Sequence, residues 1–524
     1  MRPLFLFAAL NIAVPALLAV PAEEAPSAVD LFSAQATSLQ KENLLVKPVT
    51  ADEVKKLVNA GQKISLADTV PVALKQNLGL LVTQTEHERV RESLEIADAQ
   101  FDPTLTASST YNNTGTPYLR SQSRGTYGHS WNNEIALNKK FQTGTTATIY
   151  SGFNRQYNTG TFVDPDSRAS VGIEIAQPLL KGFGSEINLA AVARAQKNID
   201  QSALNLRENT LDLIYNTEVA YWNLSANYAL IFARLSSLRY AELVLEQTKK
   251  KRTLKSATKE DILRAEADVA SRRVSLVSAR QSVQDADDAL RKILGQTGSE
   301  SLEVYQVSSL LDDAGTPMPE FQSWIRQVRA FDIESRIREL EREKADIDID
   351  VARDNDRANL DLILGAEASG RESSPRYAVG GVADRTGYNL SAGLRLSMPV
   401  GFRASRAALR QAVRSRESAT LAIAQAEQSA MFNARAAWRA EEAARERLDA
   451  AKKSLSMQHE AFEAQIAKYN VGACSLTDVI SAQDSLDSAR LALIQAAYDV
   501  AVTRSKVHRL DGRILSDYGF IWQE

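Results

Sequence analysis

Cysteine is almost absent from this chain of 524 residues, since Cys474 is the only one. A single thiol excludes an internal disulfide framework, and no cysteine stands near the N-terminus to carry a lipid anchor. Histidine is nearly as scarce, and its four copies lack the spacing of metal ligands: His87, His129, His459 and His508. We therefore expect neither a metal nor a cofactor.

Charge of one sign and long apolar runs are also missing. The net charge is only −3, which gives no compositional support for nucleic-acid binding. Beyond the first 22 residues, no stretch reaches the roughly 18 consecutive apolar residues of a transmembrane helix. A mature chain that enters a membrane must then do so as a closed β-barrel, which satisfies every backbone hydrogen bond.

Residues 1–22 predict a secretory signal peptide, with a basic start, a mostly apolar stretch and a small residue, Ala22, before the expected cleavage point. A retained membrane anchor is the alternative. It is less favoured because Asn11 and Pro15 interrupt a run that is already short. Residues 23–62 are weakly patterned, and we interpret them as an N-terminal linker or periplasmic segment with a short helix near Ala51–Ala60.

Two apolar ladders with a period of seven residues dominate the rest of the chain. They consist of Ile262, Val269, Leu276, Val283 and Leu290, and of Val479, Leu486, Leu493, Val500 and Val507. One offset of 217 residues superimposes them and also pairs Asp261 with Asp478. A seven-residue period predicts helices in a coiled coil, and its recurrence indicates an internal duplication.

The duplication divides the mature chain into two repeats, 63–295 and 321–512, with a connector at 296–320 and a tail at 513–524. Each repeat is expected to contain a helix, strands, a very long helix, a turn and a heptad helix. The expected helices are 65–100, 188–253, 258–294, 321–358, 403–467 and 475–510. The longest would extend on the order of 100 Å, which no compact domain can bury.

Between the helices the apolar period switches to two, which predicts β-strands. The expected strands are 104–111, 130–139, 145–154, 170–177, 360–368 and 388–398. Pro178 and Pro399 end the last strand of each repeat, at the exits from strand to helix. The alternation is typical of a barrel wall with one lipid face and one lumen face. A soluble β-sandwich on a helical stalk is the alternative interpretation.

Several short motifs in this order carry a resemblance to a known family. They are Ile64-Ser65-Leu66-Ala67-Asp68, Gln177-Pro178-Leu179-Leu180, Met398-Pro399-Val400, and Tyr469-Asn470-Val471-Gly472 followed by Leu476-Thr477-Asp478-Val479. Over residues 65–512 the chain resembles the TolC-like outer membrane efflux proteins. The implied fold is α-helical with membrane β-strands: a duplicated helical-hairpin tunnel plus strands that complete a trimeric transmembrane β-barrel.

The resemblance also implies a function and partners. Such a homotrimer is the exit duct of a tripartite efflux or type I secretion system, with its barrel in the outer membrane and its tunnel in the periplasm. Its partners are a periplasmic adaptor (membrane fusion) protein and an inner-membrane transporter of the RND or ABC type. The duct is a passive conduit and no enzyme. Oligomerisation is also a physical requirement, because one chain has too few strands to close a wide barrel.

The strand count departs from the family, which has two strands per repeat, whereas the first repeat here has four. The additional pair, 130–154, either enlarges the barrel or forms an external hairpin. We expect an external or rim hairpin.

The resemblance also implies residues at the closed end of the tunnel. Asp478 matches an acidic ring that faces the pore, although Ser481 stands where the family often has a second acid. Tyr469 matches a residue that helps to hold the end shut, but its basic partner is replaced by Cys474. A plainer interpretation is that Asp478, like the equivalent Asp261, stabilises the start of a helix.

A basic run, Lys249-Lys250-Lys251-Arg252, lies at the turn of the first hairpin, and Val471-Gly472 marks the turn of the second. We interpret both turns as docking sites for the adaptor. The alternative for the basic run is a solvated helix face, the usual meaning of a charge run.

Two other functions remain open. A structural coiled-coil or surface-stalk protein would explain the heptads but not the duplicated strands. A secreted enzyme would need a phosphate loop, a nucleophile motif or a metal cluster, and the sequence offers none. Neither the exported cargo nor the particular transporter can be inferred from these residues.

Overall fold

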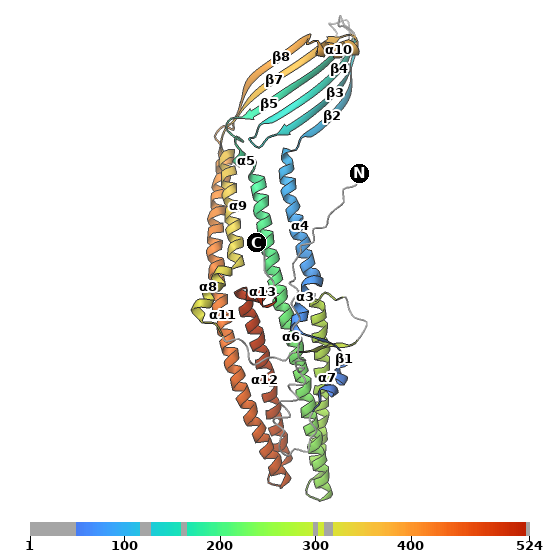
Figure 1. Ribbon diagram of the computed structural model, residues 1–524, viewed down its shortest axis with the longest axis vertical. Helices are drawn as coiled ribbons and strands as arrows, with labels where there is room; N and C mark the ends of the chain where they lie inside the picture. Colours follow the sequence, from blue (N-terminus) through green and yellow to red (C-terminus); the bar gives the residue numbers. More distant parts are fainter. Residues whose placement is uncertain (1–48, 116–126, 159–164, 297–301, 309–317, 520–524) are drawn as a thin grey trace. The chain divides into compact units, whose positions relative to one another are not determined.

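The computed structural model describes residues 49–519 apart from 116–126, 159–164, 297–301 and 309–317 (Figure 1). The expected signal peptide lies outside the described residues. The chain forms two contact units. Of the described residues, unit 1 contains those up to Thr85, those in Asn205–Ile333 and those from Glu427 onward, and unit 2 contains those in Glu86–Leu204 and Glu334–Ala426.

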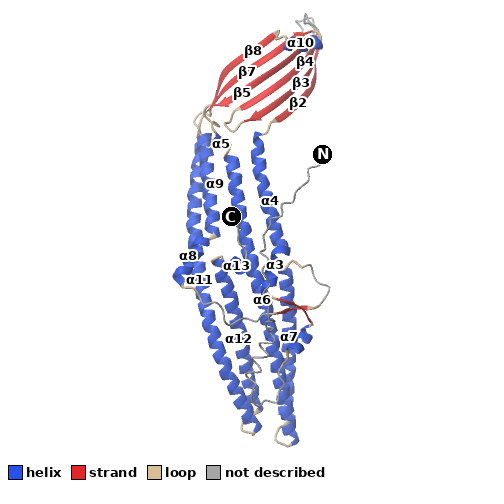
Figure 2. Cartoon of the chain, viewed as in Figure 1, coloured by secondary structure: helices blue, strands red, loops and turns tan. Residues whose placement is uncertain are grey.

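Unit 2 contains a six-stranded antiparallel sheet in the order β2-β3-β4-β5-β7-β8 (Figure 2). Its strands are β2 Thr104–Gly115, β3 Tyr127–Lys140, β4 Thr146–Asn158, β5 Asp166–Pro178, β7 Asn359–Glu372 and β8 Gly387–Ser397. The structure thus confirms all six strands that the two-residue period predicted.

The expectation of an external hairpin at 130–154 is wrong. β3 pairs with β2 from Thr104↔Asn138 to Gly115↔Tyr127, and it pairs with β4 on its other side. β4 in turn pairs with β5. A strand that is hydrogen-bonded along both edges is an interior strand, so the additional pair belongs to the sheet itself.

The sheet has one apolar and one polar face, because side chains alternate along each strand. A row of directly paired apolar residues crosses all six strands: Leu105, Leu137, Ile149, Ile173, Ala366 and Leu390. The neighbouring row on the opposite face consists of Thr106, Ala136, Tyr150, Gly172, Glu367 and Asn389. This two-faced pattern is typical of a wall between lipid and water.

A short helix that the sequence did not indicate, α10 (Pro375–Ala383), lies between β7 and β8. Its buried Ala378 approaches the sheet at Gly370. A Cβ atom on Gly370 would lie 2.0 Å from the carbonyl oxygen of Ala378, so glycine is required for this contact. The segment was expected to be a loop, because its only signal is the Pro375 at the first helical position.

Four long helices precede or follow the strands of the sheet in the chain: α4 Leu78–Asp98, α6 Ala190–Thr253, α9 Ile333–Asn355 and α11 Arg403–Asn470. Two short helices lie at the junctions with the sheet, η1 Ala99–Phe101 after α4 and α5 Ser185–Asn188 before α6. Within unit 2, α6 and α9 are joined by charged pairs such as Lys197–Glu343 at 2.7 Å. None of the helices in the described residues combines the length and the apolar character needed to cross a membrane.

Unit 1 contains two helical hairpins, formed by α6 with α7 (Lys259–Ile293) and by α11 with α12 (Leu476–Leu510). The heptad ladders supply much of their core: Val269, Val283 and Leu290 are buried in α7, and Val479, Leu486, Val500 and Val507 are buried in α12. The predicted heptad helices and the turns before them are therefore confirmed.

Two predicted helices are interrupted. The helix expected at 65–100 is divided at Asn77 into α3 (Leu66–Gln76) and α4, and the helix expected at 321–358 is divided at Asp332 into α8 (Phe321–Phe331) and α9. Asn77 donates to the carbonyl of Ile293 at the end of α7 (2.8 Å) and accepts the Leu80 amide (2.9 Å). The Asn77 side chain thus caps the start of α4 and joins the break to the end of α7.

The connector and the linker meet in a small parallel sheet of β1 (Ala60–Ile64) and β6 (Val304–Val307). The predicted short helix nearby is present as α2 (Ala51–Val58), whereas the tail contains an unexpected helix, α13 (Arg513–Asp517). The hydroxyl of Tyr228 donates to the carbonyl of Tyr305 (2.8 Å) and ties β6 to α6. Both strands are too short to show a period in the sequence.

Candidate functional site

The candidate site is the end of the two hairpins in unit 1, where both helix starts carry the same cap. At α7, Asp261 Oδ2 accepts the amide and the hydroxyl of Thr258 at 2.8 and 2.7 Å. At α12, Asp478 Oδ2 accepts the amide and the hydroxyl of Ser475 at 2.9 and 2.7 Å. Each hydroxyl accepts the aspartate amide in return, so both ends have a full capping box.

These caps set the electrostatics of both aspartates. Hydrogen bonds from Thr258 hold the pKa of Asp261 below its ordinary value, and those from Ser475 do the same for Asp478. Asp478 is exposed and Asp261 is half-buried, and both carboxylates are ionised at neutral pH. Helix capping is therefore the role that the geometry supports directly for both residues, and the pore-facing role of Asp478 stays a prediction.

Tyr469, near the end of α11, is buried against the first hairpin. Its hydroxyl lies 3.0 Å from Oγ1 of Thr248, which itself donates to the carbonyl of Val244 (2.8 Å). Tyr469 must therefore be the donor of the contact with Thr248. Lys251 donates to the Tyr469 carbonyl, and its Nζ lies 3.4 Å from the centre of the ring. Tyr469 of the second hairpin is thus bound to α6 by two hydrogen bonds and a cation–π contact.

Cys474 does not replace the missing basic partner. Its Sγ contacts the carbonyl of Gln465 at 3.5 Å, within its own hairpin. Burial raises the pKa of this thiol, so it stays neutral at neutral pH. The cation beside Tyr469 is Lys251, which comes from the basic run of the other hairpin.

The basic run is not a uniform surface patch. Lys249 pairs with Glu266 at 3.1 Å and Lys250 with Glu246 at 2.7 Å, whereas Arg252 donates to the carbonyl of Ala257 at 3.1 Å. At the other turn, Val471 is 81% exposed, and Gly472 adopts a φ of +80° that favours glycine. Val471 and Gly472 therefore present an open apolar turn.

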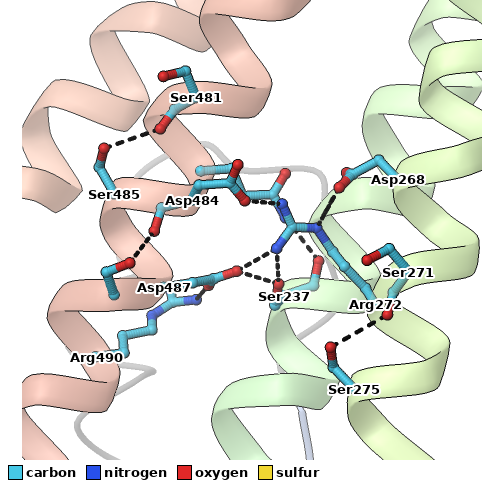
Figure 3. A network of polar contacts seen from close by, with 12 residues as sticks. Ser237, Asp268, Ser271, Arg272, Ser275, Ser481, Asp484, Ser485, Asp487 and Arg490 are labelled. Atoms are coloured by element: carbon cyan, nitrogen blue, oxygen red, sulfur yellow. Dashed lines mark hydrogen bonds and ion pairs between the residues drawn. The ribbon is translucent and has the colours of Figure 1, made fainter.

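The most extensive polar contact between the hairpins was not predicted from the sequence (Figure 3). Arg272 of α7 lies in the centre, with its side chain 9% exposed. It contacts Asp487 of α12 at 2.5 Å, Asp268 of its own helix at 3.0 Å, and Ser237 Oγ of α6 at 2.7 Å. One buried guanidinium thus connects three helices from two hairpins.

The acceptor in this network is also removed from water. Asp487 receives a hydrogen bond from the hydroxyl of Ser237, and Arg490 lies 3.5 Å away. Burial raises the pKa of Asp487, an effect that these partners offset only in part. Gln483 donates to the carbonyl of Ser237 at 2.9 Å and completes the tie between α12 and α6.

The sequence does contain a signal for Arg272. Three of the four buried residues in its heptad row are alanine: Ala265, Arg272, Ala279 and Ala286. A charged residue in a row of alanines needs a charged partner, because an isolated buried charge is costly. The spacing alone does not identify the partner, since Asp487 is 215 residues away.

Pro178 and Pro399 have the positions expected of them. Pro178 is the last residue of β5, opposite Asp361 of β7, and Pro399 follows β8 by two residues. Within the described ranges, no group of three or more His, Cys, Asp and Glu residues is placed to hold a metal ion.

Comparison with known proteins identifies the family of this chain. A family model described as outer membrane efflux protein matches residues 69–296 and 328–513, which are the two repeats. The chain belongs to the outer membrane efflux protein family. This efflux protein is therefore an outer membrane channel with its helical hairpins in the periplasm. Membership of a family of channels supports the duct and not the structural stalk.

Relatives agree with this assignment. The efflux protein is 23% identical over 371 residues to the outer membrane efflux protein BepC of Brucella suis biovar 1 (strain 1330), a match that covers 70% of this chain and 77% of BepC. It shares the fold of the Campylobacter jejuni CmeC outer membrane channel, with a TM-score of 0.63, 17% identity, and coverage of 92% of this chain and 90% of CmeC.

A second solved structure is the open state of the Neisseria gonorrhoeae MtrE outer membrane channel. The TM-score is 0.62 and the identity 18%, with 85% of this chain and 88% of MtrE covered. At these identities the two structures show that the fold is common. The contacts at the hairpin ends described above are those of this chain.

Proposed function

We propose that three copies of this efflux protein form a passive duct from the periplasm to the cell exterior, and that the hairpin ends are its gate. The family assignment supports the channel, and the observation that carries the gate is the set of polar ties between the hairpins. Tyr469 contacts Thr248, and Arg272 contacts Asp487. The duct opens when the second hairpin separates from the first and these ties break.

Charge at the gate follows from the same arrangement. Asp261, which is half-buried, and Asp478, which is exposed, are both ionised at the starts of α7 and α12. Repeated around a threefold axis, these carboxylates concentrate negative potential at a narrow opening, which favours cations. Arg264 also reaches from α7 to the hydroxyl of Thr477 at 3.0 Å, so the two acidic helix starts lie side by side.

The turns of both hairpins are proposed as the docking site for a periplasmic adaptor, which connects the duct to an inner-membrane transporter. The first turn presents the paired basic run, and the second presents the exposed Val471 beside Gly472, which has a φ of +80°. An adaptor that engages both turns could pull the hairpins apart. The transporter in this proposal is of the RND or the ABC type.

Bilayer recordings on the purified protein test the duct. We expect a small resting conductance that rises when Arg272→Met loosens the gate. Particle mass in detergent, measured by light scattering, should equal three chains. A protein that never conducts, even with this substitution, would contradict the duct and favour a stalk.

A crosslink tests the docking site. A photoreactive residue at Val471 should capture a membrane-anchored adaptor in intact cells, whereas the same residue at Val82, which is exposed on α4, should not. Equal capture at both positions would contradict docking at the turns.

A further inference from the structure

The sheet of unit 2 ends in two edge strands of nearly equal length that carry no protection. β2 has 12 residues and β8 has 11. β2 contains neither a proline nor a charged residue, and the only charged residue of β8 is Arg395. Exposed edges of soluble proteins are usually interrupted by proline, lysine or a bulge, because a bare edge pairs with other chains. These two edges are therefore built for pairing.

The direction of the strands allows the two edges to pair with each other across copies. All neighbours in the six-stranded order are antiparallel, so β2 and β8 run in opposite directions. When copies are placed head to tail, β8 of one copy meets β2 of the next in an antiparallel pair. An odd number of strands per copy would force a parallel pair at every junction.

The two faces also continue across such a junction. On the apolar face, Leu105 in β2 and Leu390 in β8 are 70% and 74% exposed, although each lies in a row whose interior members are partly covered by their neighbours. Closing the sheet places these edge residues in one uninterrupted band. The same closure leaves no backbone group unpaired in lipid, where each would cost several kcal/mol.

We propose that all six strands of each copy enter the membrane wall, so that three copies close one barrel of eighteen strands, with β8 of one copy bonded to β2 of the next. This inference rests on the trimer of the proposed function. Eighteen strands about 4.8 Å apart and tilted by about 40° enclose about 36 Å between backbones, whereas four strands per copy would enclose about 24 Å.

The polar face then lines a wide lumen that carries charges of both signs, since Arg168, Arg371 and Arg395 also lie on this face. Glu134 of β3, Glu174 of β5 and Glu367 of β7 lie on this face, and the Tyr150 hydroxyl donates to Glu367 at 2.7 Å. Tyr150 crosses over Gly172, where a Cβ atom would approach the ring to within 2.5 Å. The barrel is therefore not the constriction for bulky cargo, and the hairpin ends set the size limit.

Disulfide crosslinking in a Cys474→Ser background tests the junction. Ser108→Cys in β2 is combined in turn with Asn389→Cys, Ser391→Cys and Gly393→Cys in β8, all on the polar face. Oxidation of the purified protein should yield covalently linked dimers and trimers for at least one combination. As a matched control, Ser108→Cys with Glu134→Cys joins directly paired residues of one chain and should leave the protein monomeric on a denaturing gel.

The outcomes separate this inference from the proposed function. A particle of three chains in which no β8 position links to β2 would overturn the eighteen-stranded barrel and leave the duct intact. A particle of one chain would overturn both.

The width has a test of its own. Glu134→Cys in the same background is labelled with maleimide polymers of increasing size. We expect labelling by polymers too large for a twelve-stranded lumen. If labelling stops at the size that twelve strands admit, the wide barrel is refuted.

Discussion

Arg272 lies at the centre of the polar network in the proposed gate. It is a charge in a row of alanines, and its carboxylate partner Asp487 belongs to the other hairpin. Replacing one member of a buried pair leaves the other without compensation, which costs about 3–5 kcal/mol, whereas replacing both with apolar residues is often neutral. The pair therefore specifies which helices meet more than it adds to overall stability.

Arg272→Met is predicted to destabilise the contact between the hairpins by about 3–5 kcal/mol, because the buried Asp487 loses its close cation and keeps only the Ser237 hydroxyl and Arg490 at 3.5 Å. Hydrogen exchange along α12 should become faster, and the resting conductance should rise. The double variant Arg272→Met with Asp487→Leu should recover part of the loss.

The adjacent arginine provides a matched control. Arg273 pairs with Glu242 at 3.1 Å, but both side chains are largely exposed. Arg273→Met should therefore change stability by less than about 1 kcal/mol. Equal effects of the two substitutions would show that burial of Arg272 is not what matters.

Tyr469→Phe is predicted to weaken the gate by about 1 kcal/mol in each copy, since it removes one hydrogen bond and keeps the ring beside Lys251. Bilayer recordings should show a higher open probability. Tyr498→Phe, farther along α12, should leave it unchanged. An unaltered gate in Tyr469→Phe would assign gating to the Arg272 network alone.

At the scale of elements, the duplication is most evident where helices begin. The pairs Thr258 with Asp261 and Ser475 with Asp478 form the same cap at an offset of 217 residues. Both aspartates have a pKa lowered by the cap. Such a carboxylate stabilises the folded state above its unfolded pKa, and this contribution is lost as the pH falls through the folded value.

The hairpin ends are therefore predicted to lose stability in acid, below pH about 4, as Asp261 and Asp478 become protonated. The variant with Asp261→Asn and Asp478→Asn should lack this acid-dependent loss, because neither side chain titrates. Thermal unfolding followed by circular dichroism across the acidic range measures the difference. A wild-type melting temperature that is flat in acid would contradict the prediction.

The breaks between α3 and α4 and between α8 and α9 show what local sequence cannot determine. Gly295 and Gly512 follow α7 and α12 and have φ values of +73° and +78°. A Cβ on Gly295 would lie 2.0 Å from the carbonyl of Gln76, and one on Gly512 would lie 2.4 Å from the ring of Phe331. Both contacts fall beside the breaks at Asn77 and Asp332. The end of α7 therefore packs against the break between α3 and α4, and the end of α12 packs against the break between α8 and α9.

For the whole molecule, the proposed duct behaves as segments in series, so the narrowest one limits the current. The proposed gate lies in the hairpins, where Tyr469 and Arg272 hold α11 and α12 to the first hairpin. In the proposed barrel the sheet supplies a wide exit. Changes in these two proposed segments should therefore differ greatly in their effect on the current.

Resting conductance is accordingly predicted to respond strongly to Arg272→Met and hardly at all to Ser170→Ala, a substitution on the polar face of β5. Recordings at equal salt compare the two variants. A larger effect from Ser170→Ala would place the constriction in the sheet and contradict a gate at the hairpin ends.

Local pattern was sufficient for the strands of the large sheet and for the heptad helices, but not for the short elements α10, α13, β1 and β6. The two-residue period identified all six strands of the large sheet, and the seven-residue period identified α7 and α12. The positions of Asp261 and Asp478 identified them as stabilising the helix starts, whereas the capping partners Thr258 and Ser475 came from the structure. The resemblance identified Tyr469 near the gate, although its lysine partner came from a basic run that had been interpreted as a docking edge. Arg272 was missed because its partner is far away in the sequence.

The sequence by itself determined the duplicated hairpins and the two-faced strands, because helical and strand periods depend on residues within a few positions of each other. Only the tertiary structure decided that β3 and β4 are interior strands and that two of the predicted helices break at Asn77 and Asp332. It also decided that the buried Arg272 joins the two hairpins. Each of these depends on contacts between residues that are remote in the chain, and such contacts leave no local period.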